Sequence, residues 1–180
     1  MAATFAWAED NGSASGTPAK GTRTDGVTEC NWKKADDTTT AYNAAGGTIQ
    51  AGTNSYEKWL CGHFSGSYTT IGNGFFSHTS TSPGAFASGI TLMGVVGTAY
   101  TTPSRTTNSN LTVDMTADLA IGSGQVVDFG ATGPEAAGKV ATTNANPAYS
   151  QYLTTQLQTT TSAPAGDTAT ATLTLQYDEN

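Results

Sequence analysis

The stretch Thr168-Ala-Thr-Ala-Thr-Leu-Thr-Leu-Gln-Tyr-Asp-Glu-Asn180 indicates the fold class of this 180-residue chain. Over its first ten positions, threonines and Gln176 fall on one side, while alanines, leucines and Tyr177 fall on the other. Successive side chains of a strand point to opposite faces, so the pattern predicts a strand with one buried and one wet face. The preceding residues 164–167, Pro-Ala-Gly-Asp, are typical of a turn. We therefore expect residues 149–159 to form an antiparallel hairpin with this strand.

The rest of the chain also favours short strands between turns rich in Gly, Pro and Asn. In residues 54–68, Lys58, Leu60 and Phe64 fall on one strand face, and Trp59, Cys61 and His63 on the other. Because neither face is purely polar, we expect both to be covered. The pattern predicts an all-β fold, a β-sandwich or jelly roll of short antiparallel strands. Strands are expected within residues 29–33, 48–51, 54–68, 89–100 and 111–129, a turn or short helix over 71–78, and loops over 101–110 and 131–147.

Residues 1–26 are rich in Gly, Ser, Thr and Ala, with Phe5 and Trp7 as the only large apolar side chains. This composition predicts an extended N-terminal arm, followed by a single β-sandwich domain over residues 27–180. The two aromatic side chains have two interpretations, contact with a neighbouring subunit or packing on their own domain. If the arm is separate, deleting residues 1–26 should leave the domain folded.

The composition predicts a thin hydrophobic core. Leu, Ile, Val and Phe together number 25 of 180 residues, below the roughly 20% level at which disorder becomes a serious interpretation. The net charge of only −7 and the 16 aromatic residues argue for a folded chain, because aromatic side chains bury large areas. Such a domain gains stability by burying more surface against partners.

Charge and hydropathy exclude several classes of function. Seven Lys and Arg residues against 14 Asp and Glu leave no basic stretch for phosphates, so we expect no nucleic-acid binding. No run approaches the roughly 18 apolar residues of a membrane span, and the N-terminus lacks the features of a signal peptide. Two cysteines, Cys30 and Cys61, are too few for a disulfide framework, and two reduced thiols are favoured over a bridge.

No motif in the chain predicts catalysis, a cofactor or a metal centre. Cys61 and His63 share a strand face, and Cys30 or His78 could join them, but the ligand spacing of a zinc site is missing. Asp36 and Asp37 lack the spacing of a calcium loop. Three further acids (Glu57, Asp114 and Asp128) show no pattern of a glycosidase pair, and the Asn11-Gly-Ser and Asn110-Leu-Thr sequences match glycosylation sites only by a common pattern.

The aromatic residues have two interpretations. Trp59, Phe64, Tyr68, Phe75 and Phe76 either line a face that binds sugar or peptide, or they fill a core that has only 19 Leu, Ile and Val residues. The core interpretation is favoured. As contacts to neighbouring subunits, the candidate interface residues are Phe5, Trp7, Trp59 and Phe64.

Two stretches resemble small virion structural proteins of tailed bacteriophages, above all head-decoration proteins. They are Asn54-Ser-Tyr-Glu-Lys-Trp-Leu-Cys-Gly-His-Phe-Ser-Gly66 and the segments of residues 152–180 that include Tyr-Leu-Thr-Thr-Gln-Leu-Gln and Leu-Thr-Leu-Gln-Tyr-Asp-Glu-Asn. The resemblance implies an all-β subunit without cofactor or catalysis, which associates with copies of itself and with a major capsid protein or other virion proteins. It also implies a place in the virion, after assembly in the host cytoplasm. The alternatives are a tail, fibre or extracellular filament subunit, and a glycan-binding module.

Overall fold

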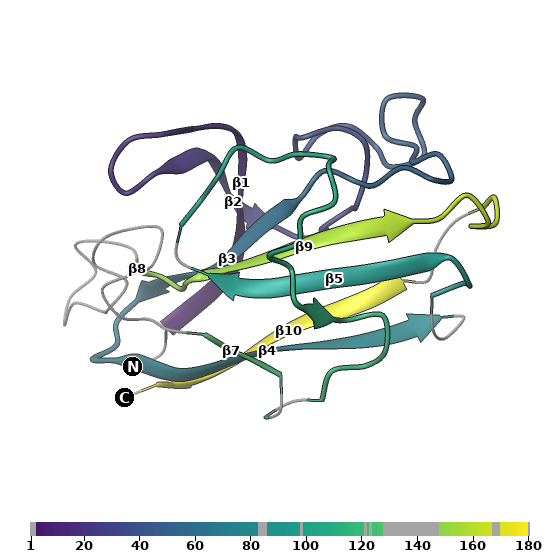
Figure 1. Cartoon of the computed structure of the whole chain (residues 1–180). Coiled ribbons are helices and arrows are strands. Elements are labelled where there is room, and N and C mark those ends of the chain that lie inside the picture. Colours follow the sequence, from purple (N-terminus) through teal and green to yellow (C-terminus); the bar gives the residue numbers. More distant parts are fainter. Residues whose placement is uncertain are drawn as a thin grey trace.

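The computed structural model describes residues 3–82, 86–97, 99–120, 122, 124–127, 148–166 and 170–179, with backbone only for 80–82. Within these residues the chain forms strands and loops without a helix, so the all-β prediction is confirmed (Figure 1). No helix in the described part is long and apolar enough to cross a membrane. The strands are β1 (Ala3–Ser15), β2 (Lys20–Val27), β3 (Lys58–Gly66), β4 (Ile71–Ser82), β5 (Ile90–Gly97), β6 (Val113–Asp114), β7 (Gln125–Val127), β8 (Ala148–Tyr149), β9 (Tyr152–Thr159) and β10 (Thr170–Glu179).

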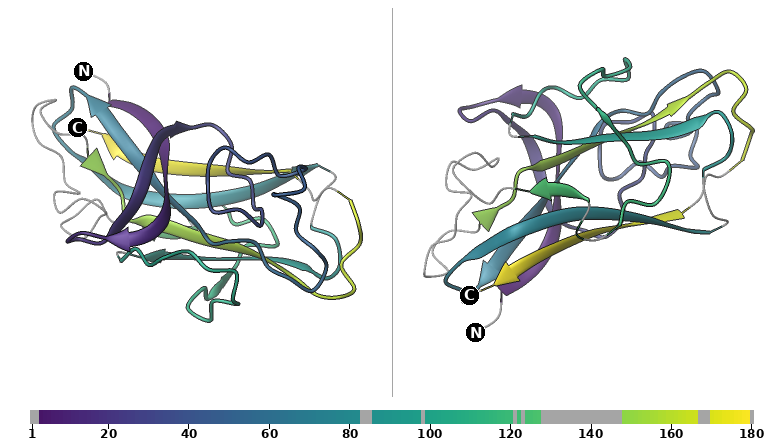
Figure 2. Two further views of the ribbon diagram at one scale, coloured as in Figure 1. Left: turned by 90° about the horizontal axis from the view of Figure 1, so that it is seen from above. Right: turned by 60° about the horizontal axis from the view of Figure 1, so that its bottom comes forward.

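The strands form two antiparallel sheets that lie face to face as a sandwich (Figures 1 and 2). The larger sheet, sheet A, has the order β2-β1-β3-β9-β5-β6, and β8 pairs with the end of β3. The smaller one, sheet B, has the order β10-β4-β7. The two ends of the described chain meet at one edge, where the Ala3 amide donates a hydrogen bond of 2.9 Å to Glu179 Oε1.

The main core fills the space between the two sheets. Phe64, Leu92 and Leu153 from sheet A meet Phe76 and Leu175 from sheet B, and all five are at most 8% exposed. Alternation explains the arrangement, since every second residue of each strand faces the opposite sheet. The aromatic side chains supply the volume that the few aliphatic residues lack, as the sequence predicts.

A second buried cluster lies on the other face of sheet A. It contains Ala8, Trp59, Cys61, Tyr100, Tyr149 and Tyr152. Trp59 and Cys61 alternate along β3 with the core-facing Leu60 and Phe64, so the expectation that both faces of this segment are covered is confirmed. The Trp59 ring lies edge-on to the rings of Tyr100 and Tyr152, at 5.1 and 5.4 Å between centroids.

The predicted hairpin between residues 149–159 and the C-terminal strand is wrong, although both strands exist. β9 pairs with β3 and β5 in sheet A, whereas β10 pairs with β4 in sheet B. The chain between them therefore crosses from one layer to the other, through a turn in which Gly166 has a φ of 125°. Alternation shows which face of a strand is buried, but it carries no information about which strand lies beside it.

Other boundaries also differ from the sequence predictions. Residues 29–33 and 48–51 are loop, and residues 71–78 belong to strand β4 rather than to a turn or helix. The two short strands expected within residues 111–129 are present as β6 and β7. For residues 89–100 the sequence predicts a pair of strands, whereas their described part contains one strand, β5. The loop expected over residues 131–147 lies outside the described residues.

The expected arm over residues 1–26 is corrected over its described part, residues 3–26. β1 pairs with β3 over eight residues, from Ala3 opposite Gly66 to Asp10 opposite Trp59, and β2 pairs with β1. The segment is thus an integral part of sheet A. The sequence does not reveal these two strands, because small and polar residues such as Thr, Ala and Gly are also typical of loops. The strands are held mainly by backbone pairing with neighbouring strands, which a sequence does not show.

Candidate assembly interface

The first two candidate interface residues, Phe5 and Trp7, point into the sandwich and are partly buried there. The Phe5 ring lies 5.5 Å from the Phe64 ring and 6.2 Å from the Tyr177 ring. The Trp7 ring stacks on Phe76 of the opposite sheet at 5.4 Å. Of the two interpretations open from the sequence, packing on their own domain is the one the structure shows, since a core poor in aliphatic residues needs these rings.

The other two, Trp59 and Phe64, are internal as well. Phe64 is fully buried in the main core, and Trp59 is 6% exposed in the outer cluster of sheet A. The structure therefore brings Phe5 and Phe64 together but places Trp59 on the opposite face of the same sheet. None of the four candidate side chains is therefore fully exposed for an intermolecular contact.

A groove of about 570 Å³ opens at the edge of the sandwich, between the start of β10 and the segment that follows β2. Trp7 and Leu60 of sheet A line it from one side, and Ala171 and Leu173 of β10 from the other. Cys30, Trp32 and Tyr42 belong to its wall as well. It is a mixed apolar and polar groove, and it adjoins strand backbone.

β10 forms the outer edge of sheet B along the described residues. It spans ten residues and pairs with β4 alone. An edge strand presents backbone N–H and C=O groups to the outside, and proteins usually protect such edges with Lys, Pro or a very short strand. β10 contains neither Lys nor Pro, and its only charged residues are Asp178 and Glu179 at the end.

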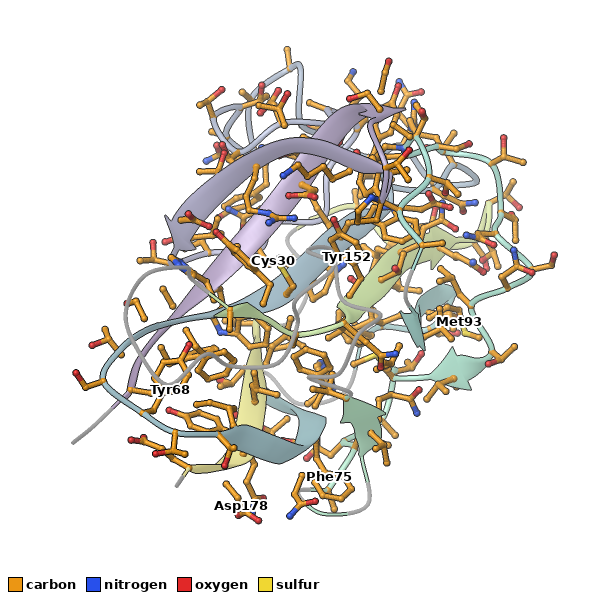
Figure 3. The ribbon with its side chains drawn as sticks, turned by 90° about the vertical axis from the view of Figure 1, so that its left-hand side faces the viewer. Cys30, Tyr68, Phe75, Met93, Tyr152 and Asp178 are labelled. Carbon is orange, nitrogen blue, oxygen red and sulfur yellow. The ribbon has the colours of Figure 1, made fainter. Side chains whose placement is uncertain are left out.

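An ion pair and a tyrosine hydroxyl connect strands β1, β2 and β9 on the outer face of sheet A. Asp10, which is fully buried, accepts hydrogen bonds from Arg23 Nε at 2.8 Å, from Arg23 Nη2 at 3.0 Å and from the Tyr152 hydroxyl. Burial and this bond to Asp10 raise the pKa of the Tyr152 hydroxyl well above its ordinary value. The Arg23 guanidinium also lies 4.2 Å over the Tyr149 ring. Tyr152 lies beneath the hairpin, on β9 (Figure 3).

A second polar cluster lies on the opposite face of the same stretch of β1, where it contacts the loop of residues 28–57. Glu9 Oε1 accepts hydrogen bonds from Lys58 Nζ at 2.7 Å and from Asn11 Nδ2 at 2.8 Å. Asn11 Nδ2 also donates to Asp36 Oδ1 at 3.0 Å. Glu9, Lys58 and Asn11 are 1%, 1% and 8% exposed. Charged groups this deeply buried need paired and hydrogen-bonded partners, and here each has them.

The four side chains considered as metal ligands do not form one cluster. Cys61 belongs to the outer cluster, His63 stacks on Tyr149 at 4.7 Å, and His78 is buried in the sandwich. Cys30 and Cys61 are not joined by a disulfide, and desolvation raises the pKa of the Cys30 thiol to about 12. Among the residues that the structure describes, no group of three or more His, Cys, Asp or Glu side chains is placed to hold a metal ion.

The candidate acids have structural contacts. Asp36 accepts from the Gly12 amide at 2.7 Å as well as from Asn11. Although desolvation opposes it, hydrogen bonds from Thr40, Lys33 and Thr39 hold the pKa of the Asp37 carboxyl well below its ordinary value. Of the remaining acids, Glu57 accepts from Asn108, Asp114 accepts from the Thr116 amide, and Asp128 lies outside the described residues.

No family model, curated protein or solved structure matches this chain. The features above therefore come from its own residues. Sequence reasoning missed the β10 edge, the groove and the buried charges of β1. A signal for the last was present, since Glu9 and Asp10 follow an alternating apolar stretch that reads as a strand once Thr4 and Ala6 are taken as its second face.

Proposed function

We propose that this chain is a non-enzymatic structural subunit of a virion, a capsid decoration protein that stabilises the shell through contacts between subunits. The observation that supports this proposal best is the ten-residue edge strand β10, which lies beside a groove at an open side of the sandwich. An incoming strand at such an edge makes main-chain hydrogen bonds, and its side chains enter the neighbouring groove. Both contributions add to the stability of a domain with few aliphatic residues.

The partner that we assign to the β10 edge is the same strand of a second copy. Residues 170–177 carry no charged side chain. If two copies of β10 pair antiparallel about a two-fold axis, Asp178 and Glu179 of each lie opposite the uncharged start of the other strand. Like charges then never face each other, which an edge between identical subunits of net charge −7 requires.

The resemblance to head-decoration proteins supplies the location in the virion, and the all-β sandwich agrees with it. A major capsid protein or another virion protein is then the second partner, and attachment of the dimer to the shell would restrain the subunits around it. A tail, fibre or filament subunit would use the same edge, so imaging must decide the location.

A glycan-binding module has less support. Such a site uses a row of exposed aromatic rings for stacking. Among the described aromatic side chains only Tyr42, at 43% exposed, is open to solvent, while the others are buried or partly buried.

Electron cryomicroscopy of particles that carry this chain tests the location, with density on the outer capsid surface as the expected result. Density on the tail or fibre, or none on the particle, would contradict the decoration role.

The edge is tested by Thr172→Lys, because Thr172 is exposed on β10 and lines the groove. The variant should shift purified protein from dimer to monomer in sedimentation experiments.

Thr79→Lys is the matched control, since Thr79 is exposed and lies directly opposite Thr172 on the neighbouring strand β4. This variant adds the same charge to the same sheet face, away from the edge, and should stay dimeric. A wild-type protein that sediments as a monomer at high concentration would overturn the pairing of β10 with itself.

A further inference from the structure

Lys58, Glu9 and Asn11 form a compact buried triad. One oxygen, Glu9 Oε1, contacts both Lys58 Nζ at 2.7 Å and Asn11 Nδ2 at 2.8 Å. An amine, an amide and a carboxylate that bridges them are the groups needed to join a lysine to an asparagine. The amine is the nucleophile, the amide carbon is the electrophile, and the carboxylate carries the proton between them.

Strand pairing places the two reacting residues side by side. β1 and β3 are antiparallel, with Glu9 opposite Leu60 and Asp10 opposite Trp59. Continuation of this register by one residue would place Asn11 opposite Lys58. Side chains of directly opposed residues are close neighbours on one sheet face, so the backbone already holds the amine near the amide. Because folding already holds the two groups close together, their reaction avoids most of the entropy loss of a reaction between separate molecules.

A second carboxylate fixes the amide. Asp36 accepts from Asn11 Nδ2 at 3.0 Å through Oδ1, and from the Gly12 amide at 2.7 Å through Oδ2. The Lys58 ammonium is similarly held, since it also donates to the Asp37 carbonyl at 3.3 Å. Burial of the three side chains keeps water away from the amide carbon, where it would compete with the amine.

We propose that Lys58 and Asn11 form an intramolecular isopeptide bond, with Glu9 as the catalytic residue that transfers the proton. The Lys58 ammonium passes one proton to the Glu9 carboxylate, and the neutral Nζ then attacks Asn11 Cγ. The Cγ–Nδ2 bond breaks, and Nδ2 leaves as ammonia with a proton that Nζ loses through Glu9. The products are a secondary amide, ammonia and a protonated Glu9, so atoms and charge balance and no oxidant is needed.

The bond would attach the N-terminal hairpin covalently to the central strand of sheet A. It would also remove a positive and a negative charge from the interior, where both are costly to keep. The inference is independent of the proposed function, because it concerns one chain and needs no partner.

Intact-mass spectrometry of the purified, reduced and denatured full chain tests the bond. The expected mass is lower than the sequence mass by one ammonia molecule. A mass equal to that of the sequence overturns the proposal and leaves the triad as a buried ion pair. This measurement uses the wild-type chain, so it does not depend on whether a variant folds.

A competing reaction also releases ammonia, because Asn11 precedes Gly12 and an Asn-Gly sequence can close to a succinimide on its own backbone. Trypsin separates the two. The isopeptide bond blocks cleavage after Lys58 and links the peptide that ends at Lys20 to the peptide of residues 35–105. Unlinked peptides with an ammonia loss at Asn11 would contradict the proposal.

Variants assign the roles of the three residues. Lys58→Arg and Glu9→Gln should each restore the full sequence mass, whereas Asn11→Asp should lose water in place of ammonia. Lys33→Arg is the matched control, since Lys33 is also buried and bound to a carboxylate, that of Asp37, at 3.0 Å. It should keep the ammonia loss. Retention of the loss in Lys58→Arg would exclude Lys58 as the nucleophile.

Discussion

The two halves of β1 are stabilised in different ways. The first half places Phe5 and Trp7 against the rings of the main core, where they are partly buried. The second half buries Glu9, Asp10 and Asn11, whose polar groups bind partners on β2, β3, β9 and the loop of residues 28–57. Apolar burial stabilises a fold in proportion to the buried area, so removal of part of that area costs only part of the stabilisation. A buried ion pair is different, because removal of one partner leaves the other charge in the interior.

The largest expected effect comes from deletion of residues 1–26. The sequence predicts that the remaining domain folds, whereas the structure shows β1 as the neighbour of β3 and the source of the buried carboxylates of Glu9 and Asp10. We expect the truncated chain to fail to fold, because it uncovers one edge of β3 and leaves Lys58 buried without Glu9. Circular dichroism and proton NMR would show this, and a truncated chain with dispersed amide signals would restore the separate arm.

Asp10→Ala tests the charged half alone. It removes the carboxylate that faces the Arg23 guanidinium, and breaking one side of a buried ion pair costs about 3–5 kcal/mol. Chemical denaturation measures the loss in free energy of unfolding. Asp25→Ala is the control, because the Asp25 side chain is 44% exposed and a surface ion pair contributes about 0–1 kcal/mol. Equal effects of the two variants would show that the buried contacts of Asp10 have no special weight.

Phe5→Ala tests the apolar half. Since Phe5 is only partly buried, we expect a loss of about 2 kcal/mol in the same denaturation experiment. Phe64→Ala provides the comparison, because Phe64 is fully buried and truncation of such a ring costs about 3–5 kcal/mol. If Phe5→Ala cost as much as Asp10→Ala, the contrast between the halves of β1 would disappear.

The smallest effect concerns His78, a polar group in the apolar core. It is fully buried in the sandwich. Burial lowers the pKa of its imidazole from 6.5, which the Asp118 carboxylate and a hydrogen bond with the Ala117 backbone oppose only in part. The unfolded chain then binds the proton more readily, so stability falls as the pH drops below about 6.5.

His78→Phe should reduce this dependence, seen as a smaller fall in melting temperature between pH 7 and pH 5, about the range where an ordinary histidine titrates. An unchanged fall would show that other groups cause it. Asp10 and His78 are thus two different kinds of buried polar side chain. Asp10 is charged and paired with Arg23, whereas burial favours the neutral form of His78.

The extent of sequence prediction follows from which interactions are local. β10 was predictable because the alternation of Ala and Leu with Thr lies within one strand. The pairing of β10 with β4, and of β1 with β3, was not, since it joins residues distant in sequence and any alternating strand fits several neighbours.

The buried charges illustrate the same limit more sharply. Glu9 and Lys58 lie 49 positions apart along the chain, and each alone resembles an ordinary surface charge. Charged residues are seldom fully buried, so composition argues against the arrangement that the fold adopts. Only the register of β1 on β3 makes them partners.

The hydrogen bond between Ala3 and Glu179 has a practical consequence. Because both ends of the described chain emerge at the same corner of the sandwich, a short linker should join them into a circular permutant, with new ends opened in an exposed loop elsewhere. For the same reason, peptides fused to either end would project in the same direction, which favours this chain as a scaffold for display.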